Sequence, residues 1–259
     1  MGEFGRREVI TALLTLGVLG ALWEGAVRIF DIPSFLLPTP SSVIQELFDR
    51  PDLYAKHLWV TFYETSLGFL IAAVLGVTVA VGIVYSRLLQ SVLYPIVILL
   101  QIIPKVAIAP LLLIWVGFGI QSKIILAVLI AFFPVVVDTV TGLRAVEDEL
   151  LQLVRVLKGQ RWQEFTKVRF PYALPFIFAG LKVAVTLAVI GAVIAEFVGG
   201  NEGLGFLVII ANVELNARMS FAALTVLSML GLFLFGVVVA LEKLLVPWAD
   251  NNHAHDAAF

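Results

Sequence analysis

Six ionisable side chains lie inside long apolar stretches of this 259-residue sequence, and their surroundings limit what they can do. A charge at the centre of a lipid bilayer is costly, so such a side chain is expected to face a watered cavity, an opposite charge or the membrane surface. Groups held in this way are candidates to contact a polar solute inside a membrane protein. They are Glu24, Glu64, Lys105, Asp138, Lys182 and Glu196.

The sequence contains none of the short motifs that would indicate an enzyme. A GxxxxGK[ST] phosphate loop, a GxSxG nucleophile turn and an HExxH zinc site are all absent. There is no cysteine, and His57, His253 and His255 do not have the spacing of a strong metal site. We therefore expect no catalysis, no cofactor and no metal in this chain, with the two tail histidines solvated. The net charge of −2 gives no reason to expect a nucleic-acid partner.

The composition predicts a membrane protein that holds these charges among apolar helices. Hydrophobic residues make up 61% of the chain, charged residues 14%, and the mean hydropathy is +1.03, whereas soluble domains carry about a quarter charged residues. We expect an all-α, polytopic fold in a single transmembrane domain, residues 1–259. A span needs about 20 apolar residues, which predicts six transmembrane helices. They cover residues 9–30, 59–85, 92–118, 124–143, 173–197 and 219–246.

Prolines and short apolar runs modify this plan. The third span contains Pro95, Pro104 and Pro110, which a membrane helix tolerates only where neighbours or cavity water satisfy the freed backbone groups. We therefore expect this span to be broken. Thr39 followed by Pro40 predicts the start of a short surface helix. The run FLVIIAN after a Gly-rich loop is too short to cross and should dip or lie flat.

Residues 147–171 form the longest polar segment and are predicted to be a helix, a turn and a second helix outside the membrane. Gly159 is expected to break the first helix. The second short helix is predicted over 162–168, and helix is disfavoured at Phe170 because Pro171 follows it. One apolar stripe follows the first helix at helical spacing. It consists of Leu150, Leu153, Val154 and Leu157.

The distribution of Lys and Arg orients the protein. With six spans, the side that holds both termini and the 147–171 segment carries ten basic residues, and the other side carries five. Cytoplasmic loops carry the excess, so the segment and both termini are predicted to be cytoplasmic. The five residues assigned to the other side are Arg28, Arg50, Lys56, Lys123 and Arg218.

The 147–171 segment resembles the cytoplasmic coupling loop of binding-protein-dependent ABC importer permeases. Their EAA motif reads Glu-Ala-Ala, three residues, Gly, nine residues, then Ile-x-Leu-Pro. Here Gln152, Leu153 and Val154 take the first place, Lys158 takes the Gly place and residues 168–171 take the last. Residues 161–208, with FLLPTPSSV and QIIPKVAIAPLLLIWVGFG, are similar to the nitrate, sulfonate, taurine and thiamine-precursor branch. The resemblance extends from about residue 35 to residue 247.

This resemblance implies a type I permease fold in the bacterial cytoplasmic membrane and a path for a small solute delivered by an external binding protein. It implies two ATPase subunits, separate chains that bind ATP and Mg, and a second permease subunit. The pair is expected to be a homodimer unless a second, different permease is encoded beside this one. The cavity candidates favour an organic solute over a bare oxyanion. The residues implied to contact the ATPase are Gln152, Leu153, Val154, Arg155, Leu157, Lys158, Gly159, Arg161, Trp162 and Pro171.

Among the ionisable groups, Lys105 and Glu196 are the best candidates for the translocation path. Lys105 follows Pro104 in the broken span, where a watered cavity or a partner such as Glu64 or Glu196 would accommodate its charge. Further lining candidates are Gln101, Glu64, Phe132 and Phe133, with plain core packing as the alternative for the two aromatic residues. Glu24 is expected to reach the surface, and Asp138 and Lys182 to pair structurally.

Three other classes of protein explain less of the sequence. A secondary transporter should show internal repeats, and none is seen. A channel leaves the 147–171 segment unexplained. A purely structural membrane scaffold does not explain a lysine directly after Pro104.

Overall fold

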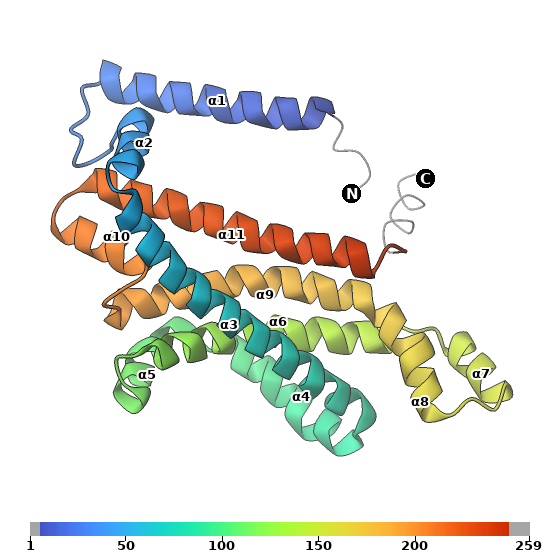
Figure 1. Ribbon diagram of the computed structural model, residues 1–259. Coiled ribbons are helices and arrows are strands. Elements are labelled where there is room, and N and C mark those ends of the chain that lie inside the picture. Colours follow the sequence, from blue (N-terminus) through green and yellow to red (C-terminus); the bar gives the residue numbers. More distant parts are fainter. Residues whose placement is uncertain (1–5, 249–259) are drawn as a thin grey trace. The chain divides into compact units, whose positions relative to one another are not determined.

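The structure, a computed structural model, describes residues 6–248, without the side chains of residues 6–9, 12 and 13. The described residues form helices and connecting turns, with no strand among them (Figure 1). The predicted all-α fold class is confirmed. The residues before Arg6 and the tail with His253 and His255 lie outside the described residues, so the expectations about the tail and both termini stay predictions.

The described chain divides into two compact units. Unit 1 contains the residues up to Thr61 together with Gly200–Leu230 and Trp248, and unit 2 contains Phe62–Gly199 and Gly231–Pro247. Unit 1 is built from three short or peripheral helices and from the first parts of two long ones. They are α1 (Arg6–Ile29), α2 (Pro40–Asp49), α10 (Leu204–Val213), and the first parts of α3 (Pro51–Tyr85) and α11 (Ala217–Leu245).

The start of α2 in unit 1 is capped as predicted. The Thr39 side chain accepts a hydrogen bond from the backbone N of Ser42, and Pro40 is the first helical residue. The Glu24 carboxylate of α1 accepts hydrogen bonds from both the backbone N and the Oγ of Ser41. It also forms an ion pair with Arg28 one turn along the helix. Glu24 therefore joins the end of α1 to the start of α2.

The short helix α10 takes its N-terminal cap from α3. The backbone N of Gly203 donates to His57 Nδ1 at 2.9 Å, and that of Leu204 donates to Thr61 Oγ1 at 2.8 Å. These groups belong to the unsatisfied N–H set that begins every helix. With 10 residues, α10 is too short to cross a bilayer, as the run FLVIIAN predicted.

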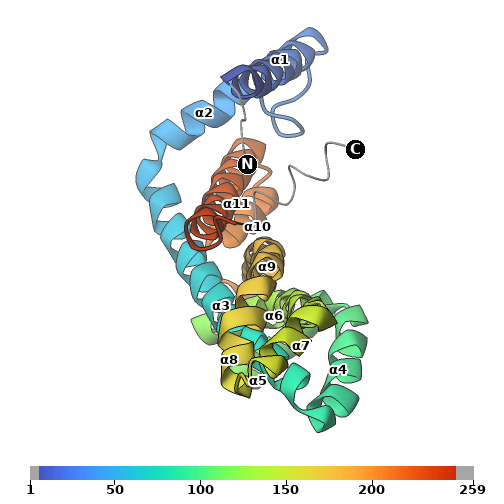
Figure 2. The same ribbon diagram turned by 90° about the vertical axis from the view of Figure 1, so that its right-hand side faces the viewer.

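The centre of unit 2 is the pair α6 (Ile120–Arg144) and α9 (Phe170–Gly199), which lie side by side in Figures 1 and 2 and are in extensive contact. Small residues allow this approach. A Cβ on Gly191 of α9 would lie 2.8 Å from Ala127 Cα, and one on Gly68 of α3 would lie 2.6 Å from Ala127 Cβ. Membrane helices use such residues because lipid provides no hydrophobic drive for association.

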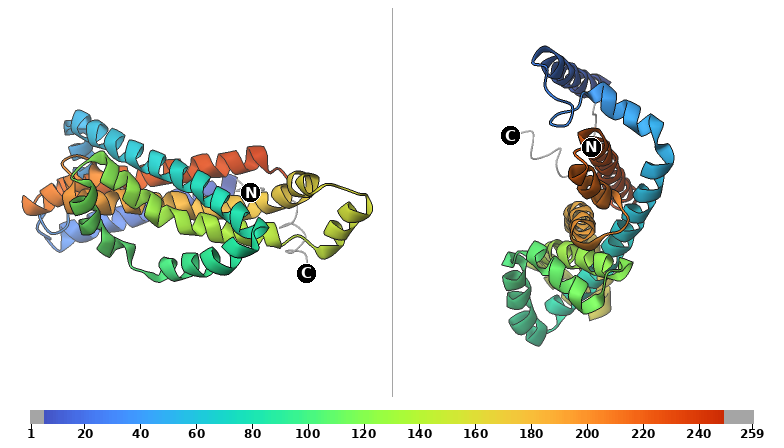
Figure 3. Two further views of the ribbon diagram at one scale, coloured as in Figure 1. Left: turned by 90° about the horizontal axis from the view of Figure 1, so that it is seen from below. Right: turned by 90° about the vertical axis from the view of Figure 1, so that its left-hand side faces the viewer.

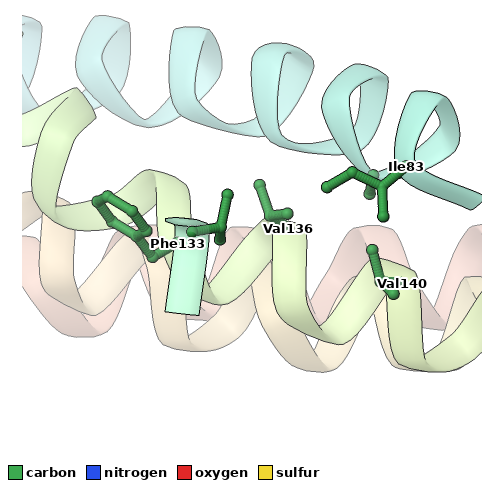
Figure 4. Packing of buried hydrophobic residues seen from close by; sticks show 6 residues of the cluster. Ile83, Phe133, Val136 and Val140 are labelled. Atoms are coloured by element: carbon green, nitrogen blue, oxygen red, sulfur yellow. The ribbon is translucent and has the colours of Figure 1, made fainter. Parts of the chain in front are cut away.

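The remaining helices of unit 2 pack around this pair. They are the later parts of α3 and α11, α4 (Arg87–Ile102), the 3₁₀ turn η1 (Lys105–Ile108) and α5 (Ala109–Val116). Between α3 and α6, the buried side chains of Ile83, Val136 and Val140 face one another (Figure 4). A second cluster joins α5 to α6 and α9 through Leu112, Leu126 and residues around them.

Four of the six predicted spans correspond to helices that are long and apolar enough to cross a membrane. Among residues 6–248, a fifth span results if the bent pair α4 and α5 is counted as one. The bend between these two is 87°, which confirms the predicted break in this apolar stretch. The first predicted span, residues 9–30, corresponds to α1, a helix of 24 residues. The second span begins earlier than predicted, since α3 starts at Pro51.

Candidate functional site: the helix pair at 147–171 and the charged groups of the spans

The first helix of the polar segment is α7 (Asp148–Val156). It ends in a hydrogen-bonded turn that explains why the EAA motif has a glycine at the place of Lys158. The Gly159 N–H donates to Val154 O and the Lys158 N–H to Arg155 O, which is the Schellman pattern. Lys158 has φ of 56°, the left-handed conformation that favours glycine. The break near Gly159 is confirmed, but the left-handed residue is Lys158, the residue in the motif's Gly place. Gly159 is required for another reason, because a Cβ there would lie 2.6 Å from Val154 Cγ1.

The second helix of the segment does not end before Pro171. Helix α8 (Arg161–Glu164) continues through the π-helical turn η2 (Phe165–Arg169) into α9, so Arg161–Gly199 is one helix of 39 residues. The prediction of a break at Phe170 is wrong: its φ of −68° and ψ of −48° are helical. A π-turn shifts the hydrogen-bond register by one residue, and this shift accommodates a proline that has no N–H to donate.

Arg169 joins the start of this long helix to the end of α6. Its Nε donates to Glu164 Oε1 at 2.8 Å, and its Nη1 donates to the carbonyl oxygen of Leu143 at 3.1 Å. The last carbonyls of a helix lack partners within it, so the guanidinium satisfies one at the end of α6. Packing of Phe165 against Tyr85 and Phe170 adds an aromatic contact with α3.

The segment exposes large apolar side chains although it lies outside the apolar stretches. Leu153, Leu157 and Trp162 are 55%, 72% and 70% exposed, while Leu151 is buried. Helix α7 projects beyond the end of α6 in two views (Figures 1 and 3). Exposed apolar groups on a projecting, charged helix pair are typical of a surface that another protein covers.

The broken span places Lys105 as the first residue of η1, directly after Pro104. Its Nζ donates to the backbone carbonyl of Gln101 at 2.9 Å and lies 4.5 Å from the centre of the Phe133 ring. The expected partners Glu64 and Glu196 are not the groups it contacts. The Phe133 side chain is buried among α3, α4 and α6, and Phe132 meets its ring edge to face.

The two expected partner carboxylates form a different cluster around a residue that the sequence analysis placed on the outer surface. Lys123 Nζ donates to Glu64 Oε1 at 2.8 Å, and the two side chains are only 8% and 1% exposed. Glu196, which is also buried, interacts electrostatically with Glu64. Lys123 was counted only as one of the basic residues outside the spans; it lies instead in the first turn of α6 and is buried. Glu64 and Glu196, two acidic residues in apolar stretches, were the sequence signal that could have predicted a buried cation close to them.

The other charged groups have separate environments. Lys182 of α9 pairs with Glu242 of α11 at 2.9 Å, so its structural partner is not Asp138. Asp138 lies where α6 passes Gly180, whose added Cβ would be 2.9 Å from Asp138 Cβ. Within the described residues, no group of three or more potential metal ligands occurs.

The amino-acid sequence matches a known protein family over more than half of its length. Residues 72–248 match the family described as binding-protein-dependent transport system inner membrane component. The chain belongs to this family. It is a transmembrane permease subunit of an ABC importer, a multi-pass component of the inner membrane.

Several relatives match over most of their length. A probable ABC transporter permease protein of Haemophilus influenzae is 39% identical over 228 residues, covering 88% of this chain and 93% of the relative. The formylaminopyrimidine transport permease protein ThiX of Halalkalibacterium halodurans is 33% identical over 91% of this chain and 94% of its own. The taurine transport system permease protein TauC of Escherichia coli is 29% identical over 93% and 90%.

A solved structure shares the fold. A chain of the inward-facing MetNI methionine ABC transporter superposes with a TM-score of 0.65 at 20% identity, covering 74% of this chain and 96% of its own. This similarity confirms the type I importer permease fold.

Proposed function

We propose that this permease couples to its ATPase through the exposed apolar face of α7 and the start of α8. The observation that carries the proposal is the exposure of Leu153 and Leu157 on α7 and of Trp162 at the start of the helix that continues into a membrane span. These residues would be the apolar anchors of the interface, with polar residues at its rim. The rim comprises Gln152, Arg155, Lys158 and Arg161; Val154, Gly159 and Pro171 shape the backbone that presents them.

The ATPase is a separate chain in this proposal, and it binds ATP and Mg. One helix pair engages one ATPase subunit, so two permease copies and two ATPases make the complete importer, with a binding protein on the outer side. The basic residues around α7 and α8 and the Lys/Arg asymmetry support a cytoplasmic position for this segment and for both termini. Closure of the ATPase pair would draw the two docking surfaces together and change which side of the bundle is open.

The translocation path is proposed to run past the break at Pro104. Lys105 supplies a cation there, in contact with the Gln101 carbonyl and the Phe133 ring, and Phe132 packs on the Phe133 ring. A backbone interrupted at membrane depth is tolerated where it lines a cavity. Glu64 and Glu196 are proposed to contribute to the path through the buried cluster that they form with Lys123.

The solute is proposed to be a small organic molecule. Relatives named for formylaminopyrimidine and riboflavin are 33% and 34% identical, against 30% for a nitrate permease. A ligand screen on the binding protein encoded beside this permease would test the class. Binding of a heterocyclic or other organic solute is expected, and binding restricted to nitrate would overturn the proposal.

Leu153→Asp tests the docking surface directly. It places a charge in the proposed apolar contact, so ATPase co-purification should fall sharply while the spans stay folded. Asp52→Asn, an exposed change in the first turn of α3, is the control and should leave co-purification intact. Full ATPase recovery with Leu153→Asp would refute the docking surface.

Native mass spectrometry should show two permeases per two ATPases, and one permease per ATPase pair would refute the homodimer.

A further inference from the structure

A pocket lined by four arginines lies between the end of α3 and the α7–α8 pair. Its volume is about 380 Å³, and its charged lining consists of Arg87, Arg155, Arg161, Arg169 and Glu164. That volume is at the lower end of the range, about 300–1,000 Å³, that small ligands occupy. Glu164 is already paired with Arg169. The pocket therefore has an excess of positive charge at one place on the protein.

Three of the four guanidinium groups have no carboxylate partner within residues 6–248. Arg87, Arg155 and Arg161 form no ion pair there, whereas Arg169 bonds to Glu164 and to the Leu143 carbonyl. Like charges converging on one pocket repel one another, and an anion between them would remove that repulsion. The planar fork of arginine matches the oxygens of a phosphate group.

The pocket is separate from the apolar docking surface of α7. Arg155 is four residues after the buried Leu151, so these two side chains share one face of the helix. Leu153 and Leu157 lie on the other side and are exposed. Arg155, which is also proposed for the rim of the docking surface, therefore lies between the pocket and that surface, while the apolar anchors face outward.

The position of the pocket, at the end of a membrane-crossing helix, indicates which molecules could supply the anion. Tyr85 also lines the pocket, at the last residue of a long apolar helix. Tyrosine and arginine at the end of a span occupy the level of lipid headgroups, and basic pockets on the cytoplasmic side bind anionic headgroups. We propose that this pocket binds a phosphate group, from an anionic phospholipid headgroup or from free phosphate. Bound there, it would tie the docking helices to the end of α3.

The test uses the purified full-length chain in detergent, without ATPase, so its result does not depend on the docking proposal. Thermal unfolding is followed while inorganic phosphate, short-chain phosphatidylglycerol or short-chain phosphatidylcholine is added at constant ionic strength. A ligand that binds only the folded state raises Tm with its concentration. Phosphate, phosphatidylglycerol or both should raise Tm. A response to phosphate alone identifies free phosphate as the source, and a response to phosphatidylglycerol alone identifies the lipid.

Variants decide whether the arginines are responsible. Arg87→Gln with Arg155→Gln should weaken the apparent affinity at least tenfold, and Lys167→Gln, an exposed basic residue outside the pocket, should leave it unchanged. If the double variant does not fold, Arg87→Lys takes its place in the test. It keeps the positive charge and should retain part of the binding. The proposal is overturned if neither anion raises Tm, if phosphatidylcholine does so equally, or if the double variant binds normally. Loss of ATPase association without any anion binding would instead make the pocket a protein contact, which also overturns it.

Discussion

Lys123 of α6 donates a hydrogen bond to Glu64 of α3 at 2.8 Å, in a place where neither side chain is appreciably exposed. Lys123→Met would leave Glu64 buried without this cation, beside a second carboxylate at Glu196. Loss of one partner of a buried pair typically costs about 3–5 kcal/mol. We expect a large fall in Tm of the detergent-solubilised permease, with partial recovery in the double variant Lys123→Met with Glu64→Gln.

The matched control for this pair is Lys56→Met. Lys56 pairs with Glu202 at 2.6 Å, but the two side chains are 61% and 47% exposed. Exposed pairs contribute about 0–1 kcal/mol, so this variant should melt close to the wild type. Equal Tm values for the two Lys→Met variants would show that the buried ion pair contributes no more to stability than the exposed one.

Gly191→Ala should destabilise the α6–α9 contact. The added Cβ would meet the Cα of Ala127 at 2.8 Å and the Leu126 carbonyl at 3.2 Å, and backbone atoms cannot rotate away. Overpacking of this kind costs roughly 1–3 kcal/mol. The same substitution at Gly231, where nothing lies within 4 Å, should be neutral or stabilising. Thermal unfolding compares the two, and a Gly191→Ala variant as stable as Gly231→Ala would contradict the close approach.

Lys158→Gly should stabilise the turn after α7. A non-glycine residue in the left-handed region costs about 1–2 kcal/mol, and glycine removes that cost at the price of a more flexible unfolded chain. Hydrogen exchange of the Lys158 and Gly159 amides, which donate the two turn bonds, should slow in the variant. Lys167→Gly, within the helical turn η2, should have the opposite effect on its own segment. Faster exchange in Lys158→Gly would show that the lysine is held by something other than its backbone.

Lys105→Met should abolish uptake while leaving the complex assembled. The Lys105 ammonium has a backbone carbonyl and an aromatic ring as its contacts, so its removal leaves no buried carboxylate unpaired. Uptake in reconstituted vesicles, together with basal ATP hydrolysis, measures the effect, and Lys56→Met again serves as the control. A Lys105→Met complex with wild-type uptake would remove support for its place in the path.

The sequence predicted the elements well because their signals are local. Length and apolarity predict the spans, Pro104 predicts the break, and helical spacing predicts the apolar face around Leu153. The burial of Lys123 was missed because its partner Glu64 is distant in sequence, and Lys123 stands just after a glycine-rich turn. The continuous helix at Phe170 was missed because the rule for residues before proline does not consider a π-turn.

The unbroken helix from Arg161 to Gly199 has a mechanical consequence. At 1.5 Å per residue it is about 58 Å long, well beyond the roughly 30 Å of the hydrocarbon core. Trp162, on the proposed docking surface, lies near one end, and Glu196, in the buried charge cluster, lies near the other. The helix bends between α8 and α9 (Figure 1), so it is not a straight rod, but no loop separates its two arms. Movement of Trp162 would therefore be passed to the arm that carries Glu196 through a continuous helical backbone.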